Sequence, residues 1–165
     1  MSDTVAMTSG QTISVENFKS ALLFVLDETF DNVHGAYLDP GDSFFATLAE
    51  ITAEQASRPV GASCASIAAQ LNHVIFYIEI GIRYMQGENP GKQDWQAAWQ
   101  LTEVSDSEWA GLIQRLRDRQ QQLLGLIEGT TEWDNDDIVG GAFAMIAHTA
   151  YHLGQIREAM CVVRG

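Results

Sequence analysis

Residues 66–85, SIAAQLNHVIFYIEIGIRYM, carry the clearest indication of how this chain folds. Their aliphatic side chains recur every three or four positions, which is the spacing of one face of an α-helix. This face consists of Ile67, Leu71, Val74, Ile78, Ile82 and Met85. Polar residues such as His73 interrupt the stretch, so it is too polar to face lipid. We therefore predict a buried helix of about six turns, capped by Ser63 or Ser66 and ended by the glycines and proline at 87–91.

Three other segments have the same periodicity, and two of them begin with recognisable caps. Ser105, with Glu108 three residues later, forms a capping-box signature, and Asn135 or Asp136 can cap the last helix. Residues 44–51 add one or two helical turns in a loop. The long helices are predicted at residues 14–33, 66–85, 105–129 and 137–163. Because no segment shows a convincing strand pattern, we predict an all-α fold, an antiparallel four-helix bundle forming one domain over residues 1–165.

The charge balance argues against two classes of partner. The chain carries nine Lys and Arg against 22 Asp and Glu, a formal charge of −13, which would repel nucleic-acid phosphates and anionic membrane surfaces. Residues 1–12 have neither the basic nor the apolar region of a secretory signal, so we expect a cytoplasmic protein. Cys64 and Cys161 match neither a metal motif nor a disulfide framework, and we expect both to be reduced core residues.

The chemical signal of the sequence lies in its histidines. His148 and His152 are four residues apart, within about 40° of each other on one helix face, so they could chelate one metal ion. The Glu that metalloproteases carry beside the first of two such histidines is missing. His73 could join the pair if the two helices are neighbours, and three neutral imidazoles would leave the metal an open position for water or substrate. On spacing alone, core histidines hydrogen-bonded to their neighbours are an equal alternative.

Three further residues are candidates for catalytic roles beside such a metal. Tyr77 shares a helix face with His73, and Gln155 lies about 20° from His148. His34, which lies near the end of the first predicted helix, could act as an acid or base. Each also has a simpler structural explanation, since buried tyrosines usually pack and donate one hydrogen bond. Arg157 points about 180° away from His148, and we expect it to serve the structure or form an ion pair instead.

Two motifs resemble those of a known family. Residues 66–79, SIAAQLNHVIFYIE, and residues 147–157, AHTAYHLGQIR, resemble the DinB-like (damage-inducible-B-like) superfamily of metalloenzymes. The second motif is the more specific one, because its HxxxH is followed by Gly-Gln-Ile-Arg, and the order of elements agrees over nearly the whole chain. The resemblance implies a four-helix bundle, often dimeric, that binds a divalent metal such as zinc or nickel. By motif, the metal ligands would be His73, His148 and His152.

The resemblance also implies a range of functions. Some members of the wider superfamily are thiol-dependent transferases or isomerases, including a mycothiol-dependent maleylpyruvate isomerase, in which the metal favours the thiolate of a low-molecular-weight thiol. We therefore expect a metal-dependent transferase or hydrolase acting on a small molecule. The alternative is a non-catalytic stress-response or small-ligand-binding module with a structural metal. A homodimer is expected because the helix at 66–85 is apolar around most of its circumference, although Trp95 and Trp99 could cover that surface instead.

Overall fold

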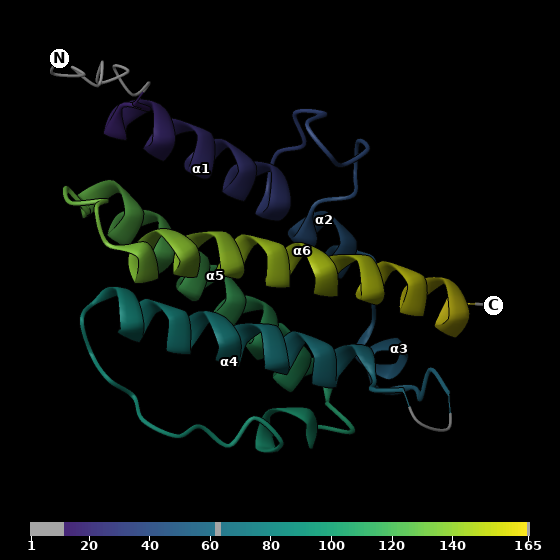
Figure 1. Cartoon of the computed structure of the whole chain (residues 1–165). Coiled ribbons are helices and arrows are strands. Elements are labelled where there is room, and N and C mark those ends of the chain that lie inside the picture. The colour runs from purple at the N-terminus through teal and green to yellow at the C-terminus, as the bar shows by residue number, and fades with distance from the viewer. Residues whose placement is uncertain (1–11, 62–63, 165) are drawn as a thin grey trace, which may run out of the picture.

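The computed structural model describes residues 12–61 and 64–164, and this part of the chain contains helices but no β-strand (Figure 1). The long helices are α1 (Val15–Phe30), α4 (Ile67–Met85), α5 (Asp106–Gly129) and α6 (Asp136–Arg164). The short ones are α2 (Phe44–Ala49), α3 (Ala53–Ser57) and the 3₁₀ helix η1 (Ala97–Trp99). All four predicted long helices are present, which confirms the all-α fold. Within the described ranges, no helix is long and apolar enough to cross a membrane.

The starts of two long helices follow the predicted caps. Ser66 caps α4, its hydroxyl accepting a hydrogen bond from the Ala69 backbone N–H at 3.2 Å. Ser63, the alternative cap, lies outside the described residues, as do residues 1–11, on which the expectation of no secretory signal largely rests. In α5 the capping box between Ser105 and Glu108 is present in both directions. The predicted cap therefore locates the start of α5 to the residue, and one of the two predicted caps, Ser66, is the cap of α4.

Two segments differ from the sequence prediction. The first long helix ends at Phe30 rather than residue 33, because the next loop folds back onto the carboxylate of Glu28, which has no exposed surface. This carboxylate accepts four backbone N–H hydrogen bonds, at 2.7–3.2 Å, from His34, Ala36, Tyr37 and Leu38. Burial raises the pKa of Glu28, but the four hydrogen bonds outweigh it and lower the pKa to about 2. The other segment is α3, which the sequence analysis does not predict and which Thr52 and Gln55 start with a capping box.

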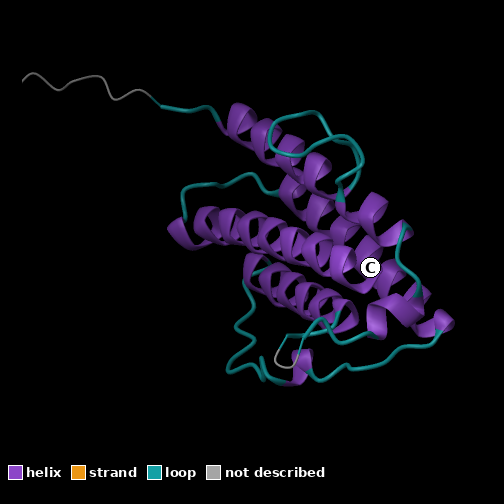
Figure 2. Ribbon diagram, turned by 90° about the vertical axis from the view of Figure 1, so that its right-hand side faces the viewer, coloured by secondary structure: helices purple, strands orange, loops and turns teal. Residues whose placement is uncertain are grey.

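The two helices that carry the predicted ligands are neighbours in the bundle. α4 packs against α5, α6, α3 and η1, and α1 packs against α5 and α6. Figure 1 shows α4 and α6 side by side, and Figure 2 shows the same layers of helices after a turn of 90°. Met85 at the end of α4 lines one cavity with Ile138 at the start of α6, whereas Gln70 near the start of α4 lines another with Ala159. The two helices therefore run antiparallel.

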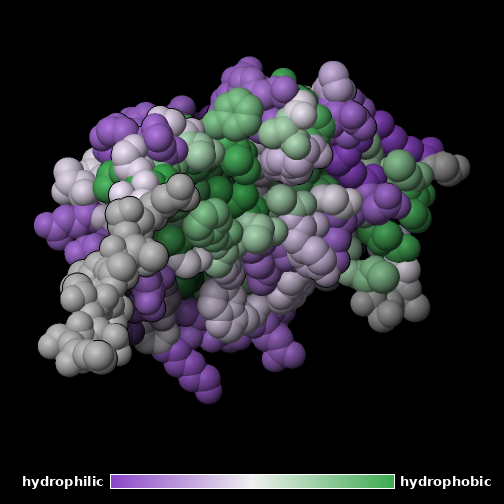
Figure 3. All heavy atoms as spheres, turned by 45° about the horizontal axis from the view of Figure 1, so that its top comes forward, coloured by the Kyte–Doolittle hydropathy of each residue, from purple (hydrophilic) through white to green (hydrophobic). Residues whose placement is uncertain are grey.

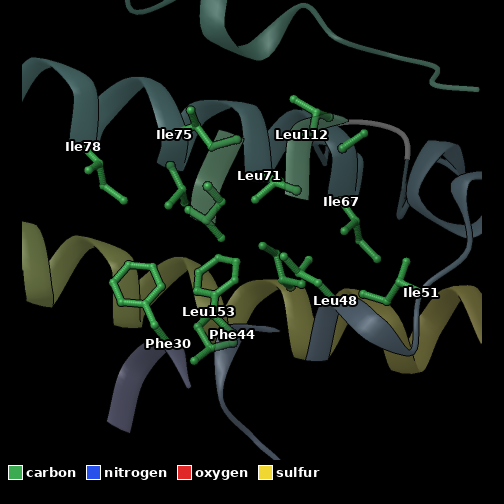
Figure 4. Close-up of a cluster of buried hydrophobic side chains, with 14 of the residues drawn as sticks. Phe30, Phe44, Leu48, Ile51, Ile67, Leu71, Ile75, Ile78, Leu112 and Leu153 are labelled. Atoms are coloured by element: carbon green, nitrogen blue, oxygen red, sulfur yellow. The ribbon is translucent and has the colours of Figure 1, made fainter. Parts of the chain in front are cut away.

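The hydrophobic core lies between the long helices. Figure 4 shows side chains of α4 pointing toward those of α1, α2 and α6. The fully buried side chains of this hydrophobic core include Phe30, Phe44, Leu48, Ile67, Leu71, Ile75, Ile78 and Leu153. α4 and α6 approach each other closely at Gly81, where an added Cβ would overlap the side chain of Met145. The cysteines are not part of this core: the expectation that Cys64 and Cys161 are core residues is wrong, because both thiols are free and exposed.

Candidate metal centre

Three histidines converge where α4 faces α6. His73 comes from α4, and His148 and His152 come from successive turns of α6. Each offers one ring nitrogen, and these atoms all lie within 4.8 Å of one another. The Nε2 atoms of His73 and His148 are 3.1 Å apart. Two nitrogens that bind one tetrahedral zinc at about 2.0–2.1 Å are about 3.3 Å apart, so this pair is already close to the separation of two metal ligands.

Electrostatics keeps the three imidazoles neutral. Burial and, to a smaller extent, the neighbouring His152 together lower the pKa of His73 to about 4. Burial likewise lowers the pKa of His148 to about 4, with contributions from His152 and His73. Burial also lowers the pKa of His152, although a hydrogen bond with the Gln155 side chain opposes this effect. At neutral pH all three rings are therefore in the unprotonated form that binds metals.

The hydrogen bonding of these rings is incomplete. The Nδ1 atoms of His73, His148 and His152 are all buried, and none has a hydrogen-bond partner among the residues that the structure describes. Buried polar side-chain atoms in proteins are generally hydrogen-bonded. The close pair of ring nitrogens is formed by the Nε2 atoms of His73 and His148, so the unpartnered Nδ1 atoms of these two rings are the second nitrogens, which a metal ligand usually donates to a partner. The convergence of three neutral imidazoles, rather than their hydrogen bonding, is therefore what fits a bound cation, and imidazole donors suit zinc and nickel. Among the residues described by the structure, no carboxylate or thiol belongs to this group.

Aromatic side chains hold the histidine rings in place. Trp99 of η1 stacks on His73 with ring centroids 4.0 Å apart, and Tyr77 stacks on His148 at 3.6 Å. The η1 segment is tied to α4 by Asn72, whose side-chain Nδ2 donates to the Ala98 carbonyl at 2.9 Å. From the sequence alone, Trp99 is expected only to cover an apolar helix surface. Its contact with the histidine depends on how a loop folds over α4, for which the sequence contains no local signal.

The three catalytic candidates have different surroundings. Tyr77 packs on His148 as described, and Gln155 lies beside His152 and donates its side-chain N–H to the Tyr151 hydroxyl at 3.0 Å. His34 is not in the three-histidine group. Its Nε2 lies 2.6 Å from a carboxylate oxygen of Asp27, and its ring stacks on Phe24. The structure thus brings two of the three candidates to the cluster and gives the third its own carboxylate partner. The ion pair predicted for Arg157 is also present, with Asp42 at 2.6 Å.

Two cavities adjoin the cluster from opposite ends of the α4–α6 pair. The first, of about 630 Å³, is lined by Tyr77, Tyr84, Trp95, Asp137, Gly141 and Met145, and is called the Tyr77 cavity below. The second, of about 620 Å³, is lined by Cys64, Gln70, Trp99, Tyr151, Gln155 and Glu158, and is called the Gln70 cavity. Both volumes lie in the range of small-molecule sites.

A helical bundle with three histidines in metal-ligand geometry defines a class of protein compatible with metal binding. Within that class, the chain belongs to the DinB superfamily, whose sequence model matches residues 41–156. The matched range contains all three histidines and confirms the resemblance in the two motifs. No match was found among curated proteins or among solved structures.

Proposed function

We propose that His73, His148 and His152 bind a divalent metal ion, zinc or nickel, and that the protein is a metal-dependent enzyme acting on a small molecule. The observation that carries this proposal is the set of three neutral imidazoles, each of which offers one ring nitrogen within 4.8 Å of the others. Three protein ligands with a fourth position left for water or substrate are typical of catalytic zinc sites, whereas structural sites usually have four protein ligands.

The reaction that we propose is transfer of a low-molecular-weight thiol to a small electrophile, which membership of the superfamily and the donor set support. When bound, a divalent cation would favour the reactive thiolate form of a thiol. The protein's own residues hold and shield the site: Tyr77 and Trp99 fix two imidazole rings by stacking. Gln155 is placed to orient a substrate near His152. We also propose that His34, which pairs with Asp27, acts as an acid or base.

The metal content of protein purified without added metal tests the first part of the proposal. We expect about one zinc or nickel ion per chain, and loss of binding in His148→Ala. His34→Ala is the matched control, because it removes a histidine outside the group and should leave binding unchanged. Absence of stoichiometric metal, combined with a melting temperature that neither zinc nor nickel changes, would show that the histidines are ordinary bundle residues.

The enzymatic part needs a separate measurement. Thiol transfer to a model electrophile should require the metal and disappear in His148→Ala while the helical circular-dichroism spectrum persists. The second candidate function is a non-catalytic stress-response or ligand-binding module with a structural metal, which the close packing of Trp99 and Tyr77 on the ligands favours. That function predicts bound metal that neither azide nor added thiols perturb and no transfer with any thiol tested.

Assembly and location complete the proposal. We propose a homodimer in the cytoplasm. Trp99 and Trp95 cover the His73 side of α4, so the partner would use other apolar side chains, of which Phe143, Tyr151 and Val162 on α6 are exposed. Figure 3 shows hydrophobic residues grouped in the middle of one face of the molecule. Sedimentation equilibrium at several concentrations tests the oligomeric state.

A further inference from the structure

The Tyr77 cavity lies between two helix faces whose side chains differ in size. Its α4 wall carries large side chains on one face of the helix, at Tyr77, Ile80 and Tyr84. Its α6 wall includes Gly141 and Ala144, which are three residues apart and so share a helix face. A Cβ added to Gly141 would meet nothing from the surrounding side chains or helices within 4 Å. The small residues of α6 therefore leave space that a larger side chain at the same position can fill.

Two aromatic side chains of this cavity are exposed to solvent. Tyr84 is 53% exposed and Trp95 is 42% exposed. A single exposed aromatic residue is ordinary, but these two line one concave site together with Tyr77. The Trp95 and Tyr77 ring centroids are 6.0 Å apart. A flat ring bound in the cavity would remove apolar surface from water and pack against these side chains edge to face or in an offset stack.

The other groups of the lining also favour an aromatic ligand. Met85 and Met145 line the cavity, and methionine sulfur makes favourable contacts with aromatic rings. No Lys, Arg or His of the described residues lines it. Of its two carboxylates, Glu88 already pairs with Arg83 at 2.7 Å, and Asp137 is exposed in the first turn of α6. Aromatic and thioether contacts, rather than a buried charge, are therefore what the cavity offers a ligand.

The cavity adjoins the metal centre through two of its walls. Tyr77 lines the cavity and also stacks on His148, with ring centroids 3.6 Å apart. Trp95 lines it as well and meets His73 edge to face at 6.4 Å. A molecule in the cavity would therefore contact side chains that touch one metal ligand on α4 and one on α6.

We propose that the Tyr77 cavity binds the aromatic ring of the electrophile on which the metal centre acts. This inference rests on the proposed function, because it names the substrate class of that centre. Binding of a ring can be measured without any reaction, so the cavity and the chemistry are tested separately.

A matched pair of unreactive alcohols tests the cavity on the full-length, zinc-loaded protein. The probes are 2-phenylethanol and 2-cyclohexylethanol, which carry the same hydroxyl group on an aromatic and a saturated ring. We expect the aromatic alcohol to bind about threefold more tightly, although its ring is the less hydrophobic of the two. The Kd of each is obtained from shifts of the Trp95 indole N–H signal in NMR spectra.

Two pairs of variants place the binding in this cavity. Gly141→Leu fills part of it and should raise the Kd of 2-phenylethanol about tenfold. Gly140→Leu, the neighbouring change outside the lining, should leave the Kd unchanged. Tyr84→Leu keeps an apolar side chain but removes a ring, and should abolish most of the preference for the aromatic alcohol. Phe143→Leu removes an exposed ring outside the cavity and should preserve that preference.

Several results would overturn the proposal. These are equal or tighter binding of the saturated alcohol, no binding of either alcohol, or an unchanged Kd in Gly141→Leu with a helical circular-dichroism spectrum. If Gly141→Leu does not fold, an unchanged preference in Tyr84→Leu is decisive against it. Dissociation of a dimer by Gly141→Leu, seen by sedimentation, would show that a second chain occupies the cavity instead.

The reaction is followed with an aromatic and a non-aromatic electrophile. With 1-chloro-2,4-dinitrobenzene, the thiol sulfur forms a bond to the ring carbon as the carbon–chlorine bond breaks, and chloride and the thiol proton are released. Gly141→Leu should raise the KM for this electrophile and leave the rate with iodoacetamide unchanged. A rise in neither KM, or an equal loss with both electrophiles, would contradict the proposal. Zinc binding is measured by chelator competition on the same samples, so retained ring binding without zinc or transfer would count against the proposed function alone.

Discussion

Tyr77 and His148 lie face to face, with ring centroids 3.6 Å apart and an angle of 9° between the ring planes. The contact joins α4 to α6 at the metal centre and fixes the plane of one ligand. Residues that orient metal ligands commonly change metal affinity by about 10–100-fold when they are removed. The tyrosine ring, rather than its hydroxyl, makes this contact.

Removing that ring should therefore weaken metal binding. Tyr77→Ala is expected to raise the zinc Kd about tenfold, measured by competition with a chromophoric chelator, because the His148 ring loses its stacking partner. Tyr77→Phe keeps the ring and should bind zinc as the parent does. If Tyr77→Phe preserves affinity but reduces thiol transfer, the hydroxyl takes part in the reaction. Equal zinc affinity in the alanine variant would mean that stacking does not position the ligand.

The pKa of Glu28 predicts how stability depends on pH. The folded-state pKa is about 2, below the ordinary value of 4.5, so the folded state favours the ionised carboxylate. Its contribution to stability is fully present above pH 4.5 and is lost as the pH falls from 4.5 toward 2. Glu28→Gln should be less stable than the parent at pH 7 in urea unfolding, and the difference should shrink over that acidic range. Glu16→Gln, an exposed change on α1, is the control; a difference that stays constant with pH would contradict the assignment.

Substitution by alanine should change the free energy of unfolding in opposite directions at Gly81, where α4 and α6 approach closely, and at Gly125, where there is open space. Gly81→Ala places a Cβ against Met145 and should lower the free energy of unfolding by about 1–3 kcal/mol, as overpacking does. Gly125→Ala in α5 meets no atom within 4 Å and should raise it by up to about 1 kcal/mol through helix propensity. Urea denaturation measures both. Stabilisation by Gly81→Ala would show that the Met145 side chain moves aside at little cost.

Arg157 belongs to the second DinB motif but serves the fold. It pairs with Asp42 at 2.6 Å and donates to the Thr47 hydroxyl at 3.2 Å, which ties α6 to the start of α2. Arg157→Ala should lower the free energy of unfolding by about 1–2 kcal/mol and leave zinc stoichiometry at its parental value. Thermal unfolding and metal analysis of the same preparation test this. Loss of metal from a folded Arg157→Ala variant would show instead that Arg157 contributes to the metal site.

The sequence predicts those features that depend on neighbouring residues. The start of α5 follows from Ser105 and Glu108, which cap it through bonds three residues apart. The end of α1 could not be predicted in this way, because Glu28 bonds to amides of a loop six to ten residues later. Local patterns do not predict contacts that depend on folding of the whole chain. The exposure of Cys64 is of this kind, and the sequence therefore does not predict it.

The same distinction applies to the metal centre. The spacing of His148 and His152 places both on one face of a helix, so their proximity follows from local geometry. Adding His73 required the family motifs, since nothing in the helical periodicity says that α4 and α6 are neighbours. The stacking of Trp99 on His73 had no counterpart in either argument, because it depends on the path of the loop between α4 and α5.

That loop has a consequence for how a metal could reach its ligands. Between α4 and α5 it contains only η1. Around η1 it is held by the Asn72 bond to Ala98, by a 3.4 Å bond from the α4 N-cap Ser66 to the Leu101 carbonyl, and by the packing of Trp95 and Trp99 on α4. Breaking these hydrogen bonds and the contacts of Trp95 and Trp99 with α4 costs less than unfolding the bundle, so the segment can open locally while the core stays packed. Backbone amides of η1 should then exchange with deuterium much faster than those of α4. Transient movement of Trp99 away from α4 would uncover one face of His73. The rate of metal uptake would then be set by how often this loop opens rather than by unfolding of the bundle.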